Sequence, residues 1–162
     1  MSREQPAALE IRAHQGDRDA FRLLIGVHKQ ALFRYVRRYT HDGDDAYDIV
    51  QESFTAAWLS IGRYDPHRPF DIWLRRIALN KCRDLARRRK VYALVLGNFG
   101  LMRRLLPADE TEAAGRDAAE TDVARMRRAI DDLPAALRDP LILTALEGLS
   151  QEAAGDVLGL SA

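Results

Sequence analysis

Apolar side chains recur at spacings of three and four residues through most of the chain, the period of α-helices that bury one face. The pattern predicts a short helix over residues 6–16, longer helices over residues 17–40 and 46–62, and a fourth over residues 70–90. Shorter helices are predicted again after residue 121. We therefore expect an all-α fold with two small helical domains, at residues 1–90 and 121–162, joined by a linker at residues 91–120.

Residues suited to helix ends support these boundaries. Asp17 is placed to cap the second helix, and either Asp44 or Asp45 can cap the third, because their carboxylates accept hydrogen bonds from free backbone N–H groups. Asp139 and Pro140 fall within an apolar run of the second domain. Proline lacks an N–H donor and crowds the preceding turn, so the helix is expected to kink there or to restart with Asp139 as its cap.

The predicted helix over residues 70–90 has two contrasting faces. One is apolar and needs a core to cover it: Phe70, Trp73, Leu74, Ile77, Ala78 and Leu85. The other carries three guanidinium groups and an amide: Arg76, Asn80, Arg83 and Arg87. This composition is typical of a surface that contacts nucleic acid, and the alternative is a solvated helix face. The preceding residues 63–69 predict a turn, because they contain an aspartate and two prolines.

The third predicted helix has an acidic and amidic exposed side. It consists of Asp45, Asp48, Gln51 and Glu52, which fall within two helical turns. Acidic side chains near a helix start interact favourably with the helix dipole, which is one explanation for them. The alternative explanation is that these residues form a docking face for another protein.

The net charge of +1 is unevenly distributed. Residues 1–90 hold 18 Lys and Arg against 12 Asp and Glu, a net +6, whereas residues 91–162 hold 7 against 12, a net −5. This asymmetry indicates one half that faces nucleic acid and one half with other partners. The single cysteine, Cys82, excludes an intrachain disulfide and fits a reducing compartment. Without a signal peptide or an apolar run of roughly 20 residues, an intracellular protein is expected.

No residue is proposed as catalytic or as a metal ligand, and no cofactor is expected. His28 lies on or near the apolar face of the second helix without metal-ligand spacing, which predicts a packed histidine. Trp58 and Trp73 lie on apolar stripes and are assigned to packing. No Gly-rich phosphate loop or pairing of a nucleophile with a base stands out, so we do not expect an enzyme.

The end of the sequence carries the pattern of a helix-turn-helix motif. Counted from Gln151, which follows a Ser150 cap, Gly155 is the fifth residue, where closely crossing helices need a small side chain. Gly159 is the ninth, where the turn needs a positive φ. The sequence stops at Ala162, before a recognition helix. A plain αα-hairpin could carry the same pattern.

Four motifs occur along the chain in this order: GDRDAF, DAYDIVQESFTAAW, RYDPHRPFDIWLRRIALNKCRDLARRR and AIDDLP…LEGLSQEAAGDVLGLS. In their order and spacing they resemble the extracytoplasmic-function RNA polymerase sigma factors, a group of bacterial transcription initiation factors. The resemblance covers nearly all of the chain except the linker. It implies a subunit without enzymatic activity that binds RNA polymerase core, directs it to promoters, and recognises and helps to open the minus-ten element.

The resemblance also implies roles for the two polar surfaces. Asp45, Asp48, Gln51 and Glu52 correspond to the docking surface for the clamp helices of the largest polymerase subunit. The turn and the basic helix correspond to the part that binds the minus-ten element, with Arg63, Tyr64, His67, Arg68, Arg76, Asn80, Arg83 and Arg87 as DNA-binding candidates. Cationic groups neutralise phosphates there, while a loop pocket takes an unstacked base. Asn80 is the best candidate beside that pocket, and Tyr64 either stacks on a base or closes the hydrophobic core.

One departure from the family concerns the second domain. Members continue into a basic recognition helix for the minus-thirty-five element, whereas this sequence is truncated before it, and we expect a piece of a longer protein rather than a natural short form. The incomplete domain could offer its leucines to the polymerase flap or to an anti-sigma factor: Leu133, Leu137, Leu141 and Leu143. The resemblance implies a cytoplasmic protein, associated with the nucleoid when bound to polymerase and not inserted in a membrane. Two other functions stay open: a polymerase- or anti-sigma-binding interaction module, and a stand-alone helical DNA-binding regulator.

Overall fold

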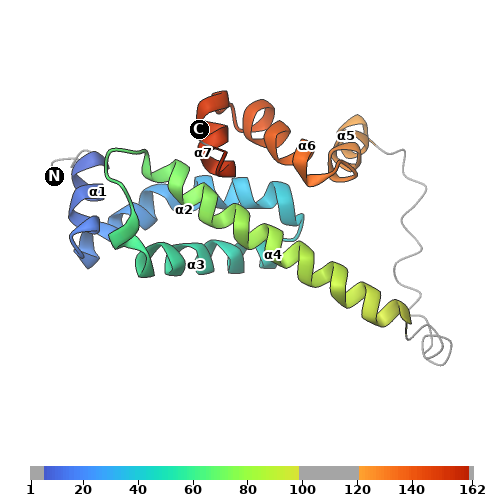
Figure 1. Cartoon of the computed structure of the whole chain (residues 1–162), viewed down its shortest axis with the longest axis horizontal. Coiled ribbons are helices and arrows are strands. Elements are labelled where there is room, and N and C mark those ends of the chain that lie inside the picture. Colours follow the sequence, from blue (N-terminus) through green and yellow to red (C-terminus); the bar gives the residue numbers. More distant parts are fainter. Residues whose placement is uncertain (1–5, 99–120, 161–162) are drawn as a thin grey trace.

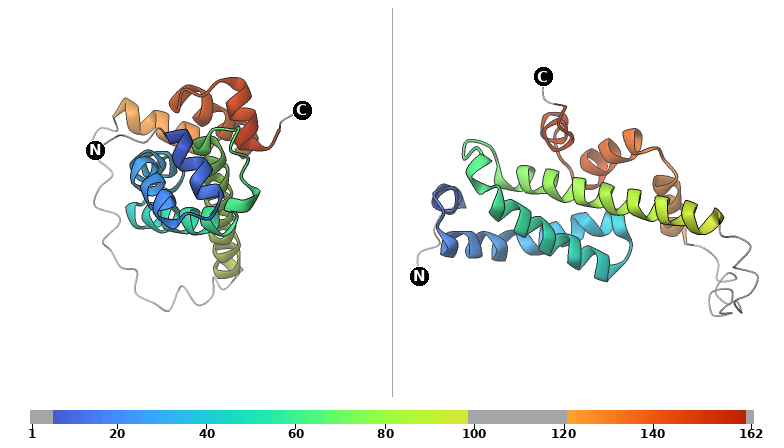
Figure 2. Two further views of the ribbon diagram at one scale, coloured as in Figure 1. Left: turned by 90° about the vertical axis from the view of Figure 1, so that its left-hand side faces the viewer. Right: turned by 60° about the horizontal axis from the view of Figure 1, so that its bottom comes forward.

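The computed structural model describes residues 6–98 and 121–160, and every regular element within them is helical, which confirms the expected all-α class. In chain order the elements are α1 (Pro6–His14), α2 (Arg18–Thr40), α3 (Gly43–Leu59), the 3₁₀ turn η1 (Ile61–Arg63), α4 (Phe70–Asn98), α5 (Asp122–Asp131), α6 (Ala135–Leu141), the π-helical turn η3 (Ile142–Leu146) and α7 (Gln151–Leu158). Helices α1 to α4 form one bundle, and α5 to α7 form a smaller unit beside it (Figures 1 and 2). None of these helices combines the length and the apolar composition needed to cross a lipid bilayer.

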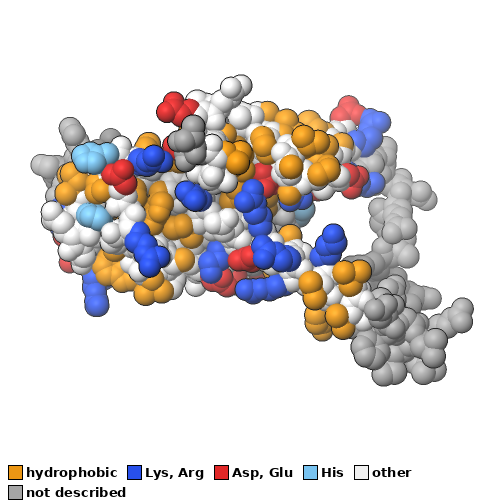
Figure 3. Space-filling model, viewed as in Figure 1, with side chains coloured by type: hydrophobic (Ala, Val, Ile, Leu, Met, Phe, Trp, Pro, Cys, Tyr) orange, Lys and Arg blue, Asp and Glu red, His pale blue; other side chains and the backbone are white. Residues whose placement is uncertain are grey.

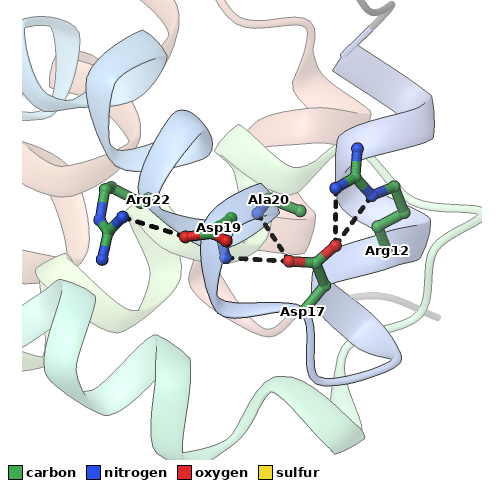
Figure 4. A network of polar contacts seen from close by, with 5 residues as sticks. All are labelled: Arg12, Asp17, Asp19, Ala20 and Arg22. Carbon is green, nitrogen blue, oxygen red and sulfur yellow. Dashed lines mark hydrogen bonds and ion pairs between the residues drawn. The ribbon is translucent and has the colours of Figure 1, made fainter.

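One carboxylate fixes the junction between α1 and α2 (Figure 4). Oδ1 of Asp17 accepts hydrogen bonds from the backbone N–H groups of Asp19 and Ala20 at 2.9 and 3.0 Å, which confirms the predicted cap. Its Oδ2 accepts two more from the Arg12 guanidinium at 2.9 and 2.7 Å. The Ala20 N–H and the Arg12 guanidinium together lower the pKa of Asp17. The cap therefore also ties α1 to the start of α2.

Aromatic rings fill the end of the bundle where α4 begins. The Phe70 ring is 1% exposed and lies 6.4 Å from the Phe21 ring of α2, centroid to centroid. It also contacts Tyr64 of the preceding turn at 5.4 Å and Trp73 at 5.6 Å. Ring pairs in tilted or edge-to-face geometry stabilise a core beyond what the burial of their apolar area contributes. The start of α4 and the turn before it are thus held on a packed aromatic cluster.

Three expected helix boundaries differ from the structure. The cap of α3 is Asp42, whose Oδ1 accepts from the N–H groups of Asp44 and Asp45 at 2.8 and 3.0 Å, so neither of the two expected residues is the cap. Helix α4 continues to Asn98, so the segment expected to be a linker begins as helix. Helix α6 passes through Pro140 and leads into the π-helical turn η3, so Asp139 does not cap a new helix.

Helix α4 is packed on two sides. On one side lie α2 and α3, and on another lies α7 (Figure 2). Leu79 and Cys82 are 0% and 5% exposed, although the apolar stripe predicted from the sequence did not include them. Leu143 and Val157, from η3 and α7, belong to the same buried cluster as the bundle core. The two helical units therefore share one continuous hydrophobic core.

The last described helix has the expected first half of a helix-turn-helix motif. The Ser150 hydroxyl caps α7 by accepting from the Ala153 N–H at 3.1 Å. Gly159 ends it with φ +75°, a conformation that costs glycine nothing. Ser161, which follows this turn where the next helix of such a motif would be capped, lies outside the described residues. Leu143 is fully buried, so it is not one of the leucines available to a partner, whereas Leu137 is 61% exposed.

Candidate functional site

The turn between η1 and α4 is held by hydrogen bonds of Asp65. Its Oδ1 accepts from the His67 N–H at 3.0 Å, and its backbone carbonyl accepts from the Arg68 N–H at 3.0 Å. Arg63, His67 and Arg68 are exposed around it. Asp65 is the aspartate from which the sequence predicted a turn here, and its side chain holds the turn by accepting from the N–H two residues on.

Tyr64 anchors this turn from the side of the hydrophobic core. Only 2% of the residue is exposed, and its hydroxyl lies 2.8 Å from Glu10 Oε2 and 2.6 Å from the Arg68 carbonyl oxygen. Burial raises the pKa of Tyr64, and burial also raises the pKa of Glu10. In this conformation the Tyr64 ring closes the core and is not available to stack on a base. Of the two roles considered for this side chain, the structure favours packing.

The polar face of α4 continues the surface of the turn. Arg76, Asn80 and Arg87 are exposed, as their stripe in the sequence predicts. Lys and Arg side chains gather along the middle of α4 on the face shown in Figure 3. Arg83, in the same stripe, is less exposed, with 36% of its side chain accessible. The turn and α4 thus form one basic surface, which would attract phosphate groups.

Acidic residues of the smaller helical unit contact this basic surface. Asp139 of α6 is 0% exposed, and its Oδ2 accepts hydrogen bonds from Nε and Nη2 of Arg83 at 3.0 and 2.8 Å. Asp156 of α7 lies 3.3 Å from a guanidinium nitrogen of Arg68. These contacts join residues 56 and 88 positions apart in the chain. From the sequence, Asp139 marked either a kink or the cap of a restarted helix, and nothing indicated these pairs.

A third acidic residue of that unit, Glu147, also contacts the bundle. Its Oε1 accepts from Nε of Arg38 at 2.5 Å, and its Oε2 pairs with Arg75 of α4. The Arg75 guanidinium also lies 5.1 Å from the centroid of the Tyr35 ring. The side chains of Glu147 and Arg75 are only 10% and 14% exposed. Neither Glu147 nor Arg75 is a DNA-binding candidate. Their ion pair therefore joins the two helical units without involving a candidate residue.

The four acidic and amidic residues of α3 differ in their surroundings. Asp48 and Gln51 are exposed. Glu52 pairs with Lys81 of α4 at 3.1 Å, and Asp45 pairs with Arg89. Two of the four therefore also tie α3 to α4, so the helix dipole does not explain the whole set. Asp48 and Gln51 are exposed members of this face that take no part in these two pairs.

A groove that the sequence did not predict runs between α2 and α3, next to the acidic face. It has a volume of about 510 Å³. Its lining includes Ile25, Tyr47, Gln51, Phe54 and Trp58. Trp58, assigned to packing from the sequence, packs on Phe21 at 5.1 Å and also lines this groove. A partner that binds the acidic face would thus find apolar surface beside it.

His28 and Cys82 fit packing roles. The His28 ring lies 5.3 Å from the Phe70 ring, and burial lowers its pKa. Burial raises the pKa of the Cys82 thiol to about 12. Within residues 6–98 and 121–160, no group of three His, Cys, Asp or Glu side chains is arranged to hold a metal ion.

Comparisons with known proteins show which family the chain belongs to. The family model for Sigma-70 region 2 matches residues 24–91. The chain is 38% identical over 157 residues to the RNA polymerase sigma factor CnrH of Cupriavidus metallidurans, covering 94% of this chain and 82% of CnrH. Its fold is similar to the structure of CnrH in complex with the cytosolic domain of CnrY, with a TM-score of 0.67, 34% identity, and coverage of 96% and 84%. It is also similar to an engineered region 2 of sigmaE in complex with GTAAAA, with a TM-score of 0.51, 33% identity, and coverage of 56% and 95%.

Proposed function

Because the chain belongs to the family of extracytoplasmic-function RNA polymerase sigma factors, we propose that it binds bacterial RNA polymerase core and directs it to promoters. It recognises the minus-ten element and helps to open it. The polymerase performs the chemistry, and this chain contributes binding surfaces without enzymatic activity. We place the protein in the cytoplasm, and on the nucleoid when it is bound to polymerase.

The observation that carries this proposal is that one helical bundle presents two surfaces of opposite charge. The basic surface of the turn and α4 lies towards α6 and α7, whereas Lys81 and Arg89 of α4 point towards α3 and its acidic face. A single chain can therefore hold a basic protein surface and a DNA strand at the same time. Asp48 and Gln51 supply the accessible polymerase contacts, beside the apolar groove between α2 and α3.

The DNA contact divides into phosphate neutralisation and base recognition. Arg63, Arg76 and Arg87 are exposed cations that would follow a strand backbone. Asn80 is the exposed amide among them and can donate to and accept from a base edge. The aromatic cluster under the turn fixes its shape, so an unstacked base meets a preformed surface. Residues 1–90 would thus correspond to sigma region 2, and residues 121–162 to part of region 4.

The polymerase contact is tested by pull-down with bacterial core polymerase. Asp48→Arg should weaken association about tenfold, because it places a cation against a basic partner surface. Asp44→Arg makes the same change of charge at an exposed position of the same helix outside the docking set and serves as control. If the unchanged chain does not associate with core polymerase, the proposed function is wrong.

The DNA contact is tested with the assembled holoenzyme, by following promoter opening. Asn80→Ala and Arg76→Ala should slow opening, whereas Arg88→Ala, an exposed arginine of the same helix outside the candidate set, should have a smaller effect. If neither Asn80→Ala nor Arg76→Ala changes the rate of promoter opening, the chain is better explained as an interaction module that binds polymerase without contacting DNA. Specific duplex binding without polymerase would favour a stand-alone regulator.

A further inference from the structure

Helix α1 contacts the turn before α4, which carries several of the DNA-binding candidates. It lies at the end of the bundle where the chain passes from η1 into α4 (Figure 1). The family model for Sigma-70 region 2 begins at residue 24, so α1 lies outside the residues that it matches. Two side chains of α1 nevertheless form hydrogen bonds to η1 and to the turn.

The first contact is at the start of this segment. His14 Nδ1 lies 3.0 Å from the backbone carbonyl oxygen of Ile61. A carbonyl oxygen can only accept, so Nδ1 carries the proton and donates it. The same carbonyl accepts from the Tyr64 N–H at 3.1 Å, within η1. His14 thus binds the backbone where the helical turn η1 begins.

The second contact reaches the far end of the segment. Glu10 Oε2 lies 2.8 Å from the Tyr64 hydroxyl oxygen, and that oxygen lies 2.6 Å from the Arg68 carbonyl oxygen. Hydrogen bonds in such a buried environment are stronger than the same bonds in water. Helix α1 therefore holds the segment at both ends, and the DNA-binding candidates Arg63 and His67 are exposed between them.

Other side chains attach α1 to the bundle. Leu9 and Ala13 are 5% and 0% exposed and belong to the bundle core. Arg12 donates two hydrogen bonds to Asp17 at the start of α2. Removing either polar contact with the turn therefore leaves α1 attached and takes away only part of its hold on the turn.

We infer that α1 is a positioning element for promoter recognition, in which Glu10 and His14 hold the backbone of the turn in the shape that recognises the minus-ten element. The inference rests on the proposed function, because it concerns the shape of the proposed DNA surface. Glu10 and His14 act through the turn and do not need to touch DNA. A preformed turn favours the base that fits it, whereas a loosened turn can adapt to several bases.

The test uses holoenzyme on DNA that is already open, which separates recognition of the strand from opening of the duplex. The probe is a pool of duplexes with an unpaired bubble, whose non-template strand is randomised at the minus-ten element. The retained DNA is sequenced, and selectivity is the ratio of the most to the least preferred base at each position.

Glu10→Ala and His14→Leu should each lower the largest of these ratios about fivefold, the effect of one lost hydrogen bond. The total amount of DNA retained from the pool should stay within about twofold, because phosphate contacts supply most of the binding that is independent of sequence. A change that merely destabilised the chain would lower the retained amount and leave the ratios as they are.

Three further variants serve as controls. Glu10→Gln keeps a hydrogen-bonding side chain of the same length at the Tyr64 hydroxyl, and His14→Asn keeps an N–H donor for the Ile61 carbonyl, so both should keep the selectivity. Ile11→Ala truncates a side chain of α1 that is 48% exposed, and it should keep the selectivity as well.

The inference is overturned if Glu10→Ala and His14→Leu select bases as sharply as Ile11→Ala does. It is also overturned if Glu10→Gln and His14→Asn lose as much selectivity as the larger changes. Binding to core polymerase is measured in parallel and should be equal in all these proteins, because the changes lie outside the acidic face of α3. If Glu10→Ala and His14→Leu both lose polymerase binding, the two contacts support the whole bundle, and the inference is wrong.

The same measurements separate the inference from the proposed function. If the unchanged chain binds polymerase and selects bases while every variant behaves like it, only the inference fails. If the unchanged chain does not bind polymerase, or its holoenzyme selects no base, the proposed function itself fails.

Discussion

The hydroxyl of Tyr64 provides a sharp test of how the turn before α4 is held. Its single proton faces two acceptors, the Arg68 carbonyl at 2.6 Å and Glu10 Oε2 at 2.8 Å. Tyr64→Phe removes this hydroxyl and keeps the ring, which packs 5.4 Å from Phe70 and 5.0 Å from Trp73. The change therefore isolates the hydrogen bonds from the aromatic packing.

The expected size follows from the number of bonds lost. One proton makes one full hydrogen bond at a time, worth about 0.5–1.5 kcal/mol to a neutral acceptor and about 1.5–3 kcal/mol to a charged one. We expect the free energy of unfolding to fall by about 1–2 kcal/mol, because Glu10 is partly solvated and water can replace part of its loss. For a chain of this size the Tm should fall by about 3–6 °C.

Urea unfolding followed by tryptophan fluorescence measures this directly, because Trp73 lies beside Tyr64. Tyr92→Phe is the matched control, since Tyr92 is 68% exposed and its change should stay within about 0.5 kcal/mol. Should Tyr64→Phe cost no more than Tyr92→Phe, the hydroxyl does not anchor the turn. A slower promoter opening in Tyr64→Phe would further show that the shape of the turn matters for DNA.

Three further predictions concern the same bundle. Glu10→Gln should raise the free energy of unfolding at pH 7 by about 0.5–1 kcal/mol, because the amide can donate to the Tyr64 oxygen. Burial raises the pKa of Glu10, so its protonated carboxyl favours the folded state, and the gain measured by urea unfolding should shrink as the pH falls through this raised pKa towards the ordinary value. Phe70→Ala should cost about 3–5 kcal/mol in the same assay, and a loss no larger than that of Leu59→Ala, at an 80% exposed position, would contradict the aromatic cluster. The Cys82 thiol should resist alkylation at pH 8 until urea unfolds the chain, since burial raises its pKa to about 12, and rapid alkylation of the folded chain would disprove its burial.

The amino-acid sequence by itself determined the helices and the surfaces that each helix carries. The period of apolar residues predicted the helices of the bundle, and local signals placed the caps at Asp17 and Ser150 and the stop at Gly159. These features depend on neighbours within about one helical turn, so they can be inferred from the order of residues alone. The exposed row of Arg76, Asn80 and Arg87 follows from the same period.

The tertiary structure decided what covers those surfaces. Asp139 and Glu147 meet Arg83 and Arg38 across 56 and 109 residues of chain, and no local pattern specifies which carboxylate finds which guanidinium. Leu79 is likewise fully buried outside the predicted apolar stripe, on a helix that packs on α7 as well as on α2 and α3. A helix period predicts that a face is polar or apolar, but whether that face meets solvent, DNA or another part of the chain depends on how the helices pack.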